Sequence, residues 1–419
     1  MIKHLLKIIW TERRINVWIL LELALVFCVL WFCTDYLYFS VKRYMEPKGF
    51  DIEHTYRIGI SMKDEGRKIV ASGSDTEKEE MLQDIWTIYD RIKKHPAIEN
   101  AGYSKASIPY TGSSRYRGLF VDSTEMNSWM KVISPGFFDV FKISILSGTP
   151  FNDENSVTGN PALISGNRKD KFGRKNMNEV KEIRYPDDTK SNIIGVANKV
   201  KRDEYGDYNP VIYYPLKKDD QWTIAGNLEI SVRVKSEADK NFAEQFTKDM
   251  RNQLEVGSYF LTSVTSFEKD RENYLNSMGL SGNFKSIFAI STFLFINIFL
   301  AVVGTFWLRT QSRRGEIGLR VAMGASQKSI QKMFIGETIL LLLLASIVAA
   351  VICINVTMVD VLKDIGVPVI DRSEAPGMSQ YLINYGITFL FLALIAVIAV
   401  WYPAQKASKI QPAEALHDE

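Results

Sequence analysis

The residue types and spacings that catalysis requires are missing from this sequence. Its four histidines (His4, His54, His95 and His417) are scattered, and none has the partner spacing that holds a zinc ion. No G-x-x-x-x-G-K-[ST] phosphate loop is present, so the sequence offers no nucleotide site of the usual kind. No G-x-S-x-G turn presents a serine nucleophile. We therefore expect a protein that is not an enzyme and that has no catalytic residue, metal or cofactor of its own.

The distribution of apolar residues says more than the overall composition does. The 419 residues are 46% hydrophobic and 24% charged, values that would also suit a soluble enzyme, and the net charge of +3 gives no reason to expect nucleic acid as a partner. The apolar residues, however, are concentrated at the two ends of the chain and the polar ones in the middle. The three cysteines lie in apolar runs, where they are interpreted as small buried hydrophobic residues.

Four apolar segments are long enough to cross a bilayer, which requires about 20 residues. The first is longer than the apolar core of a signal peptide, and no small-residue cleavage site follows it, so we expect an uncleaved anchor. The other three lack the polar stripe of a helix in a soluble core. The predicted spans are residues 15–39, 284–308, 333–359 and 381–402.

Basic residues predict how these spans are oriented, because cytoplasmic loops are enriched in Lys and Arg. Residues 1–14, the loop 309–332 and residues 403–419 are all rich in Lys and Arg, and are predicted to be cytoplasmic. The short loop 360–380 contains two basic and four acidic residues, and is predicted to be periplasmic. The long insert, residues 40–283, then lies outside as well.

The insert contains both helical and strand patterns. Apolar residues recur at helical spacing between Asp75 and Lys94, at Met81, Ile85, Ile88, Tyr89 and Ile92. We expect an α+β subdomain from about 50–130 and 217–267, a mainly β insertion at about 131–216, and a stalk helix at about 268–283. The predicted fold is a membrane protein with four transmembrane α-helices and a large α+β extracytoplasmic domain inserted between spans 1 and 2.

Several sequence motifs resemble one known family. The stretch RTQSRRGEIGLRVAMGASQKSIQKMFIGETILLLL at 309–343 resembles the hallmark of the MacB/FtsX-like family of ABC transporter permeases. Residues 132–151 and 193–216 resemble that family's periplasmic core domain. The C-terminal stretch at 402–419 is similar to the family's ending, with the matching residues Pro403, Pro412, Glu414, Ala415 and Leu416.

The first motif also predicts a structure. Glu316 to Met323 can form a short amphipathic helix, with Ile317 and Val321 on its apolar side and Leu319 and Met323 as further apolar positions. Gly324 would end that helix. The resemblance implies that this is the coupling helix that docks on the ATPase. The positive-inside rule alone would explain the basic residues, but not the glycines and the glutamate. The predicted coupling residues are Arg313, Arg314, Glu316, Ile317, Gly318, Arg320, Val321, Met323, Gly324 and Ala325.

Two acidic residues within the predicted spans need an explanation, because a charge in a bilayer is costly. For Glu22 there are three explanations: it belongs to a proton or substrate relay, it faces a partner helix in a dimer, or it stays protonated. Glu337 lies near the start of the third span, where it can reach the interface. A group of tyrosines in the insert is interpreted as strand packing rather than a ligand site; its members are Tyr205, Tyr208, Tyr213 and Tyr214.

The resemblance implies a function in the bacterial cytoplasmic (inner) membrane. Such permeases form dimers with a second copy or a paralogue, and two copies of a separate cytoplasmic ABC ATPase bind ATP and Mg. The spans then move the periplasmic domain, an action called mechanotransmission, to export or extract a peptide, drug or lipoprotein. A periplasmic adaptor or outer-membrane channel is a further expected partner. The competing hypothesis is a non-transporting signalling or scaffold protein that regulates a periplasmic partner such as a cell-wall hydrolase.

Overall fold

The chain divides into two compact units in the computed structural model. The sheet unit is Arg43–Leu280, and the helical unit combines Met1–Lys42 with Ser281–Glu419. Each unit is described by itself. The described residues are 10–11, 13–112, 115–121, 124–152, 160–165, 179–220, 223–224, 228–358 and 377–408.

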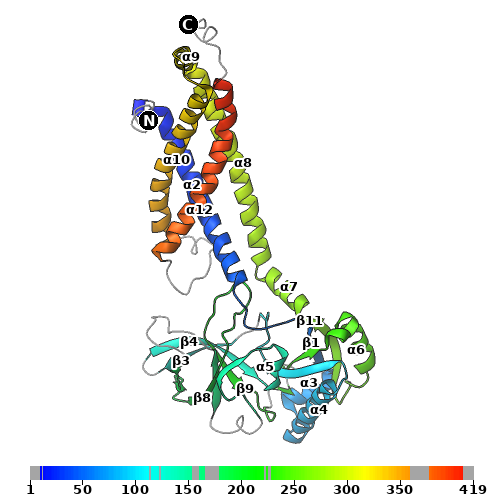
Figure 1. The fold of residues 1–419 in the computed structure, drawn as a ribbon. Helices are drawn as coiled ribbons and strands as arrows, with labels where there is room; N and C mark the ends of the chain where they lie inside the picture. The colour runs from blue at the N-terminus through cyan, green and yellow to red at the C-terminus, as the bar shows by residue number, and fades with distance from the viewer. Residues whose placement is uncertain are drawn as a thin grey trace. The chain divides into compact units, whose positions relative to one another are not determined.

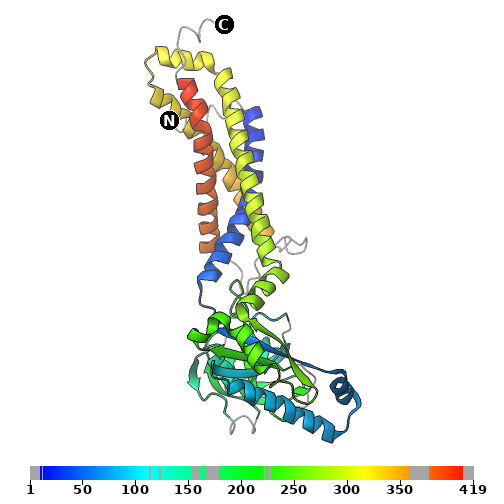
Figure 2. The ribbon, with the colours of Figure 1, turned by 90° about the vertical axis from the view of Figure 1, so that its right-hand side faces the viewer.

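The helical unit is built from four long apolar helices that run side by side (Figure 1 and Figure 2). They are α2 (Arg13–Met45), α8 (Leu280–Ser312), α10 (Gln327–Met358) and α12 (Met378–Ser408). Each is long and apolar enough to cross a membrane. A short helix, α9 (Arg314–Ala322), follows α8 and precedes α10. The predicted set of four spans is therefore confirmed.

Large side chains fill the core of this bundle, and small ones let its helices approach. Phe27 and Trp31 of α2 and Phe334 of α10 are buried in one apolar cluster. Ala345 and Ala349 of α10 are buried in the same cluster, as expected for close helix packing in a membrane. The helices are longer than the predicted spans, because a helix continues past the hydrocarbon layer as long as its backbone stays hydrogen-bonded.

The sheet unit contains one sheet of eleven strands, in which six strands close into a ring. The strand order is β11-β1-β10-β2-β4-β3-β7-β8-β6-β9; β9 also pairs with β4, which closes the ring, and β5 pairs with β8. The open part of the sheet consists of β1 (Thr55–Met62), β2 (Ile98–Lys105), β10 (Glu229–Val234) and β11 (Tyr259–Ser266). The ring consists of β3 (Arg115–Val121), β4 (Thr124–Ile133), β6 (Pro161–Ser165), β7 (Glu182–Arg184), β8 (Lys190–Ala197) and β9 (Val211–Pro215), with β5 at Ile145–Gly148.

The ring has its own core, separate from that of the open sheet. Leu119, Met126, Ile164, Ile183 and Ile212 belong to one buried cluster. Since successive strand residues point to opposite faces, residues such as Leu163 and Tyr213 pack instead into a second cluster outside the ring. The predicted β insertion is thus a small closed barrel, and closure removes the free edges of these strands.

Helices cover both faces of the open part of the sheet. On one face lie α4 (Asp75–Lys93) and α6 (Phe242–Met250), which share a core with β1, β2 and β10. Ser74 and Glu77 form a capping box that starts α4. The apolar residues of α4 that recur at helical spacing are all buried, namely Met81, Ile85, Ile88, Tyr89 and Ile92.

The short helix α5 (Gly136–Val140) packs on the opposite face, and two glycines permit its close approach. A Cβ atom on Gly136 would lie 2.2 Å from the carbonyl oxygen of Ala101, and one on Gly102 would lie 2.8 Å from the backbone nitrogen of Phe137. The buried Arg233 of β10 points to the same face, where its Nε donates to the Val140 carbonyl at 2.7 Å. Backbone contacts therefore fix α5 on the sheet.

The structure differs from the sequence prediction at two places in this unit. The expected boundary at 130/131 falls inside β4, because β3 and β4 belong to the barrel. The expected stalk helix at 268–283 is interrupted: α7 (Phe267–Ser277) ends before Met278, and α8 begins at Leu280. Gly279 has φ +71°, a conformation that favours glycine and ends a helix.

Candidate functional site

The short helix α9 has defined ends, which fix its length. Arg313 is the residue before its first turn. At its other end Gly324 has φ +91°, its backbone N–H donates to the Val321 carbonyl at 3.0 Å, and the N–H of Ala325 donates to the Arg320 carbonyl at 2.9 Å. This pair of hydrogen bonds around a left-handed glycine is a Schellman motif. Gly324 therefore separates α9 from α10, as its residue type predicts.

The two sides of α9 face different surroundings. Ile317 is only 1% exposed and Val321 is partly buried, because both pack into the core of the helical unit. By contrast, Leu319 is 52% and Met323 is 73% exposed. Ile317 and Val321, two of the predicted coupling residues, thus lie on the side of α9 that packs against the bundle. The apolar side chains that α9 offers to a partner are those of Leu319 and Met323.

A buried ion pair joins the start of α9 to α10. The Nη1 atom of Arg313 lies 3.1 Å from an Oε2 oxygen of Glu337, and these side chains are 8% and 0% exposed. Each of these buried charges stabilises the other, because a single charge buried without an opposite charge has a large desolvation penalty. Glu337, which the sequence places near the start of the third span, is thus buried within the helical unit. It binds the arginine that precedes α9.

The remaining predicted coupling residues are distributed around the same helix. Gly318 is buried, and Nη1 of Arg320 lies 3.2 Å from the Sδ atom of Met333 on α10. The side chains of Arg314 and Glu316 lie outside the described residues, although the backbone of both belongs to α9.

The C-terminal family motif is described only in part. Pro403 lies inside α12, which continues to Ser408, so this proline does not end the helix. The other residues of the motif lie outside the described residues; they are Pro412, Glu414, Ala415 and Leu416.

Glu22 lies in a shallow groove of the helical unit. The groove is formed by α2, α8 and α10, and its other lining residues include Val26, Val302 and Leu341. No second ionisable side chain is among the residues that line it.

The four tyrosines noted in the sequence do not form one site. Tyr213 is buried against Phe138, with ring centroids 5.2 Å apart, whereas Tyr205 contacts Tyr44 at 5.8 Å. Their packing agrees with a structural role. Among the described residues, no three side chains of His, Cys, Asp or Glu come together as a metal site.

The helical unit therefore consists of four apolar helices of membrane-spanning length and one short, partly apolar helix, α9. Residues 287–412 match the FtsX-like permease C-terminal family. The predicted resemblance to the MacB/FtsX-like family is confirmed by this match and by the curated relatives. The matched family is of the permease type, which is not itself catalytic. Together with the four apolar helices, it indicates a protein of the inner membrane.

Two curated relatives illustrate the similarity. The chain is 25% identical over 333 residues to the macrolide export ATP-binding/permease protein MacB of Burkholderia thailandensis, which covers 76% of this chain and 47% of the relative. It is 28% identical over 240 residues to the ABC transporter permease YtrF of Bacillus subtilis, which covers 54% of this chain and 52% of that protein. The chain thus spans about half the length of the curated relatives it matches.

Solved structures show a partial likeness. The periplasmic region of MacB from Actinobacillus actinomycetemcomitans covers 53% of this chain and 94% of its own, at 13% identity and a TM-score of 0.32. The extracellular domain of the noncanonic ABC-type transporter YknZ from Gram-positive bacteria covers 50% of this chain and 100% of its own, at 15% identity and a TM-score of 0.31.

Proposed function

We propose that this chain is a permease subunit on which a cytoplasmic ABC ATPase docks through the exposed side of α9. The single observation that carries the proposal is the orientation of that helix. Ile317 and the Arg313–Glu337 pair attach it to the bundle, and this leaves Leu319 and Met323 exposed. Exposed apolar side chains on a rigid support are typical anchors of a protein interface.

The attachment of α9 suits a helix that transmits force. A docked ATPase that pushes on Leu319 and Met323 moves a helix whose opposite side is packed into the bundle, so the displacement passes to α10 through Ile317 and Glu337. Such movement requires rigid packing, because close-packed cores transmit strain rather than absorb it. In this proposal the ATPase binds and hydrolyses ATP with Mg, and the permease converts the movement into work on its other unit.

The rest of the proposal extends the same reasoning. The permease acts as a dimer with a second copy or a paralogue, and two ATPase copies bind the dimer. Both termini and α9 face the cytoplasm, and the sheet unit is periplasmic. The work is efflux or extraction of a periplasmic or membrane substrate such as a peptide, drug or lipoprotein, with an adaptor or outer-membrane channel as a further partner. The relative named as a macrolide exporter is consistent with this class of work.

The proposal is tested by binding of the ABC ATPase encoded nearest to this gene. The full chain is placed in lipid nanodiscs, and ATPase affinity is measured for the unaltered protein and for L319D and M323D. Each aspartate places a charge on the exposed side of α9 and leaves the buried side intact. We expect each variant to weaken binding about tenfold or more, the loss typical of an interface anchor of about 2 kcal/mol.

Met378 provides a matched control, because it is a strongly exposed methionine at the first residue of α12. M378D makes the same chemical change away from α9 and should bind the ATPase normally. Full-strength binding by both α9 variants would show that the ATPase docks elsewhere. Failure of the unaltered chain to bind any ABC ATPase of its genome would favour the signalling or scaffold hypothesis.

A further inference from the structure

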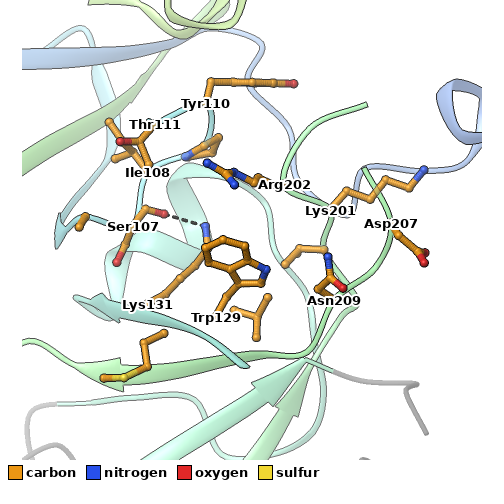
Figure 3. A pocket seen from close by; sticks show the side chains of 15 residues that line it. Ser107, Ile108, Tyr110, Thr111, Trp129, Lys131, Lys201, Arg202, Asp207 and Asn209 are labelled. Atoms are coloured by element: carbon orange, nitrogen blue, oxygen red, sulfur yellow. Dashed lines mark hydrogen bonds between the residues drawn. The ribbon is translucent and has the colours of Figure 1, made fainter. Parts of the chain in front are cut away.

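A hollow in the sheet unit is lined by three separate parts of the chain. These are the loop 106–111, the strand residues Trp129 to Lys131, and residues from the segment 200–211 (Figure 3). The hollow is open to solvent on one side, and most of its lining is apolar or aromatic. A concave site with an apolar lining and a few polar groups is the usual form of a small-molecule site.

Two cationic groups in this lining, Lys131 and Arg202, form no ion pair with another described residue. The Lys131 Nζ donates to the Ser107 carbonyl at 2.7 Å, which leaves donors of the ammonium group available. Burial lowers the pKa of Lys131 to about 8, although Glu229 opposes the shift. The Arg202 guanidinium meets only aromatic rings among the described residues, and its carbon lies 4.9 Å from the Trp129 ring centroid.

The other charged groups of the lining are paired. Lys201 is fully buried and donates to the Arg43 carbonyl at 2.5 Å, with Glu46 at 3.1 Å. Among the described residues that line the hollow, Asp207 is the one carboxylate, and it lies 3.9 Å from the Arg43 guanidinium. The hollow thus has an excess of positive charge in an apolar setting, where an anion would be held more strongly than in water.

The loop 106–111 is held in a strained shape. Ala106 has φ +48° and Tyr110 has φ +57°, a conformation that is uncommon for residues other than glycine and a true outlier for a bulky one. The Glu229 carboxylate fixes this loop by accepting from the backbone N–H groups of Ser107 and Ile108, at 2.9 and 3.2 Å. Strain that is held by surrounding hydrogen bonds is typical of binding sites.

The segment 200–208, which lines part of this hollow, also contacts the helices α2 and α7. Lys201 caps the C-terminal end of α2 through the Arg43 carbonyl. Glu204 accepts from the hydroxyl of Tyr110 at 2.7 Å and from Arg271 of α7. Glu204 is buried, and its second carboxylate oxygen has no hydrogen-bond partner among the described residues. A ligand on Arg202 would therefore restrain a segment that contacts both α2 and α7.

We propose that this hollow binds a small amphipathic anion, with its carboxylate or phosphate on Arg202 and Lys131 and its aromatic or apolar body against Trp129 and Ile108. Guanidinium and ammonium groups form the strongest hydrogen bonds with such anions, and the indole face provides apolar contact. The site goes beyond the proposed ATPase docking and does not depend on it, because it lies wholly within the sheet unit.

Saturation-transfer NMR with the full chain in nanodiscs tests the site, with empty nanodiscs as the blank. The probe is phenylpropionate. Phenylpropanol keeps the aromatic body without the charge, and propionate keeps the charge without the ring. We expect phenylpropionate to bind about tenfold or more tightly than either comparison compound, because a hydrogen bond to a charged group contributes that much in affinity.

Two further measurements locate the binding. R202Q should weaken phenylpropionate binding about tenfold, whereas R251Q, which changes an exposed arginine at the end of α6, should not alter it. Amide hydrogen exchange should slow in residues 200–208 when the probe is present. Equal binding of phenylpropanol and phenylpropionate, or equal binding by R202Q and the unaltered chain, would overturn the proposal. If R202Q does not fold, the relative affinities of the three compounds and the amide exchange data still test the site. Unchanged amide exchange in residues 200–208 would place the probe elsewhere and refute this site.

Discussion

The buried pair of Arg313 and Glu337 gives the sharpest prediction. Glu337→Gln keeps the shape of the side chain and removes its charge, so the Arg313 guanidinium stays buried without a counter-charge. The atoms of the pair are 3.1 Å apart and almost fully shielded from solvent. Removing one partner of such a pair costs about 3–5 kcal/mol. The unfolding equilibrium should therefore shift by about 100-fold or more.

The assay is equilibrium unfolding of the full chain in mixed detergent micelles with increasing SDS. Glu22→Gln is the matched control, because it neutralises a glutamate on an exposed surface of α2 and should not destabilise the protein. The double variant R313M/E337M replaces both charges with apolar side chains of similar length. It should recover most of the lost stability, since a buried ion pair and a well-packed apolar pair are often equivalent.

Two results would refute this reasoning. A stability loss below about 0.5 kcal/mol for E337Q would show that the pair is solvated and behaves as a surface ion pair. A double variant that is less stable than E337Q alone would show that the two residues contribute through separate contacts, because the loss would then be additive.

The other predictions concern both units. Gly136→Ala should destabilise the sheet unit by about 1–3 kcal/mol in thermal unfolding, because its Cβ atom would collide with the Ala101 carbonyl; an unchanged midpoint would contradict the close packing of α5. Burial opposes ionisation of Glu204, but hydrogen bonds from Tyr110 and Arg271 outweigh it and lower its pKa. The sheet unit should therefore keep this stabilisation above about pH 4.3 and lose it as the pH falls through the depressed pKa of Glu204. In the E204Q variant, the free energy of unfolding should change less with pH over this acid range. Gly324→Ala should cost about 1 kcal/mol, because φ +91° strains any other residue, and should reduce ATPase binding only slightly.

The spans and the helix α4 were predictable because each depends on a long periodic or apolar pattern. Nineteen residues of α4 carry five buried positions at helical spacing, which leaves one orientation for the helix. The nine residues of α9 are too few for that, because apolar residues occur on both of its sides. Ile317 and Leu319 are equally apolar in the sequence, and only the packing against the bundle distinguishes them.

The hollow in the sheet unit was not predictable for a different reason. Its walls come from the loop 106–111, from β4 and from the segment 200–211, which the closed strand ring brings together. No local sequence pattern predicts that ring, since β4 and β9 are far apart in the sequence and pair in parallel. The break at Gly279 was visible as a glycine in a helical pattern, but a single glycine is often tolerated within a helix.

The two chain connections between the units are mechanically unlike. On one side α2 is a single helix from Arg13 to Met45 and passes the unit boundary after Lys42 without interruption. On the other side Gly279 separates α7 from α8, next to the boundary after Leu280. A continuous helix resists bending and twisting along its length, whereas a glycine changes its backbone angles at lower steric cost than any other residue. The backbone can therefore turn more readily between α7 and α8 than within α2.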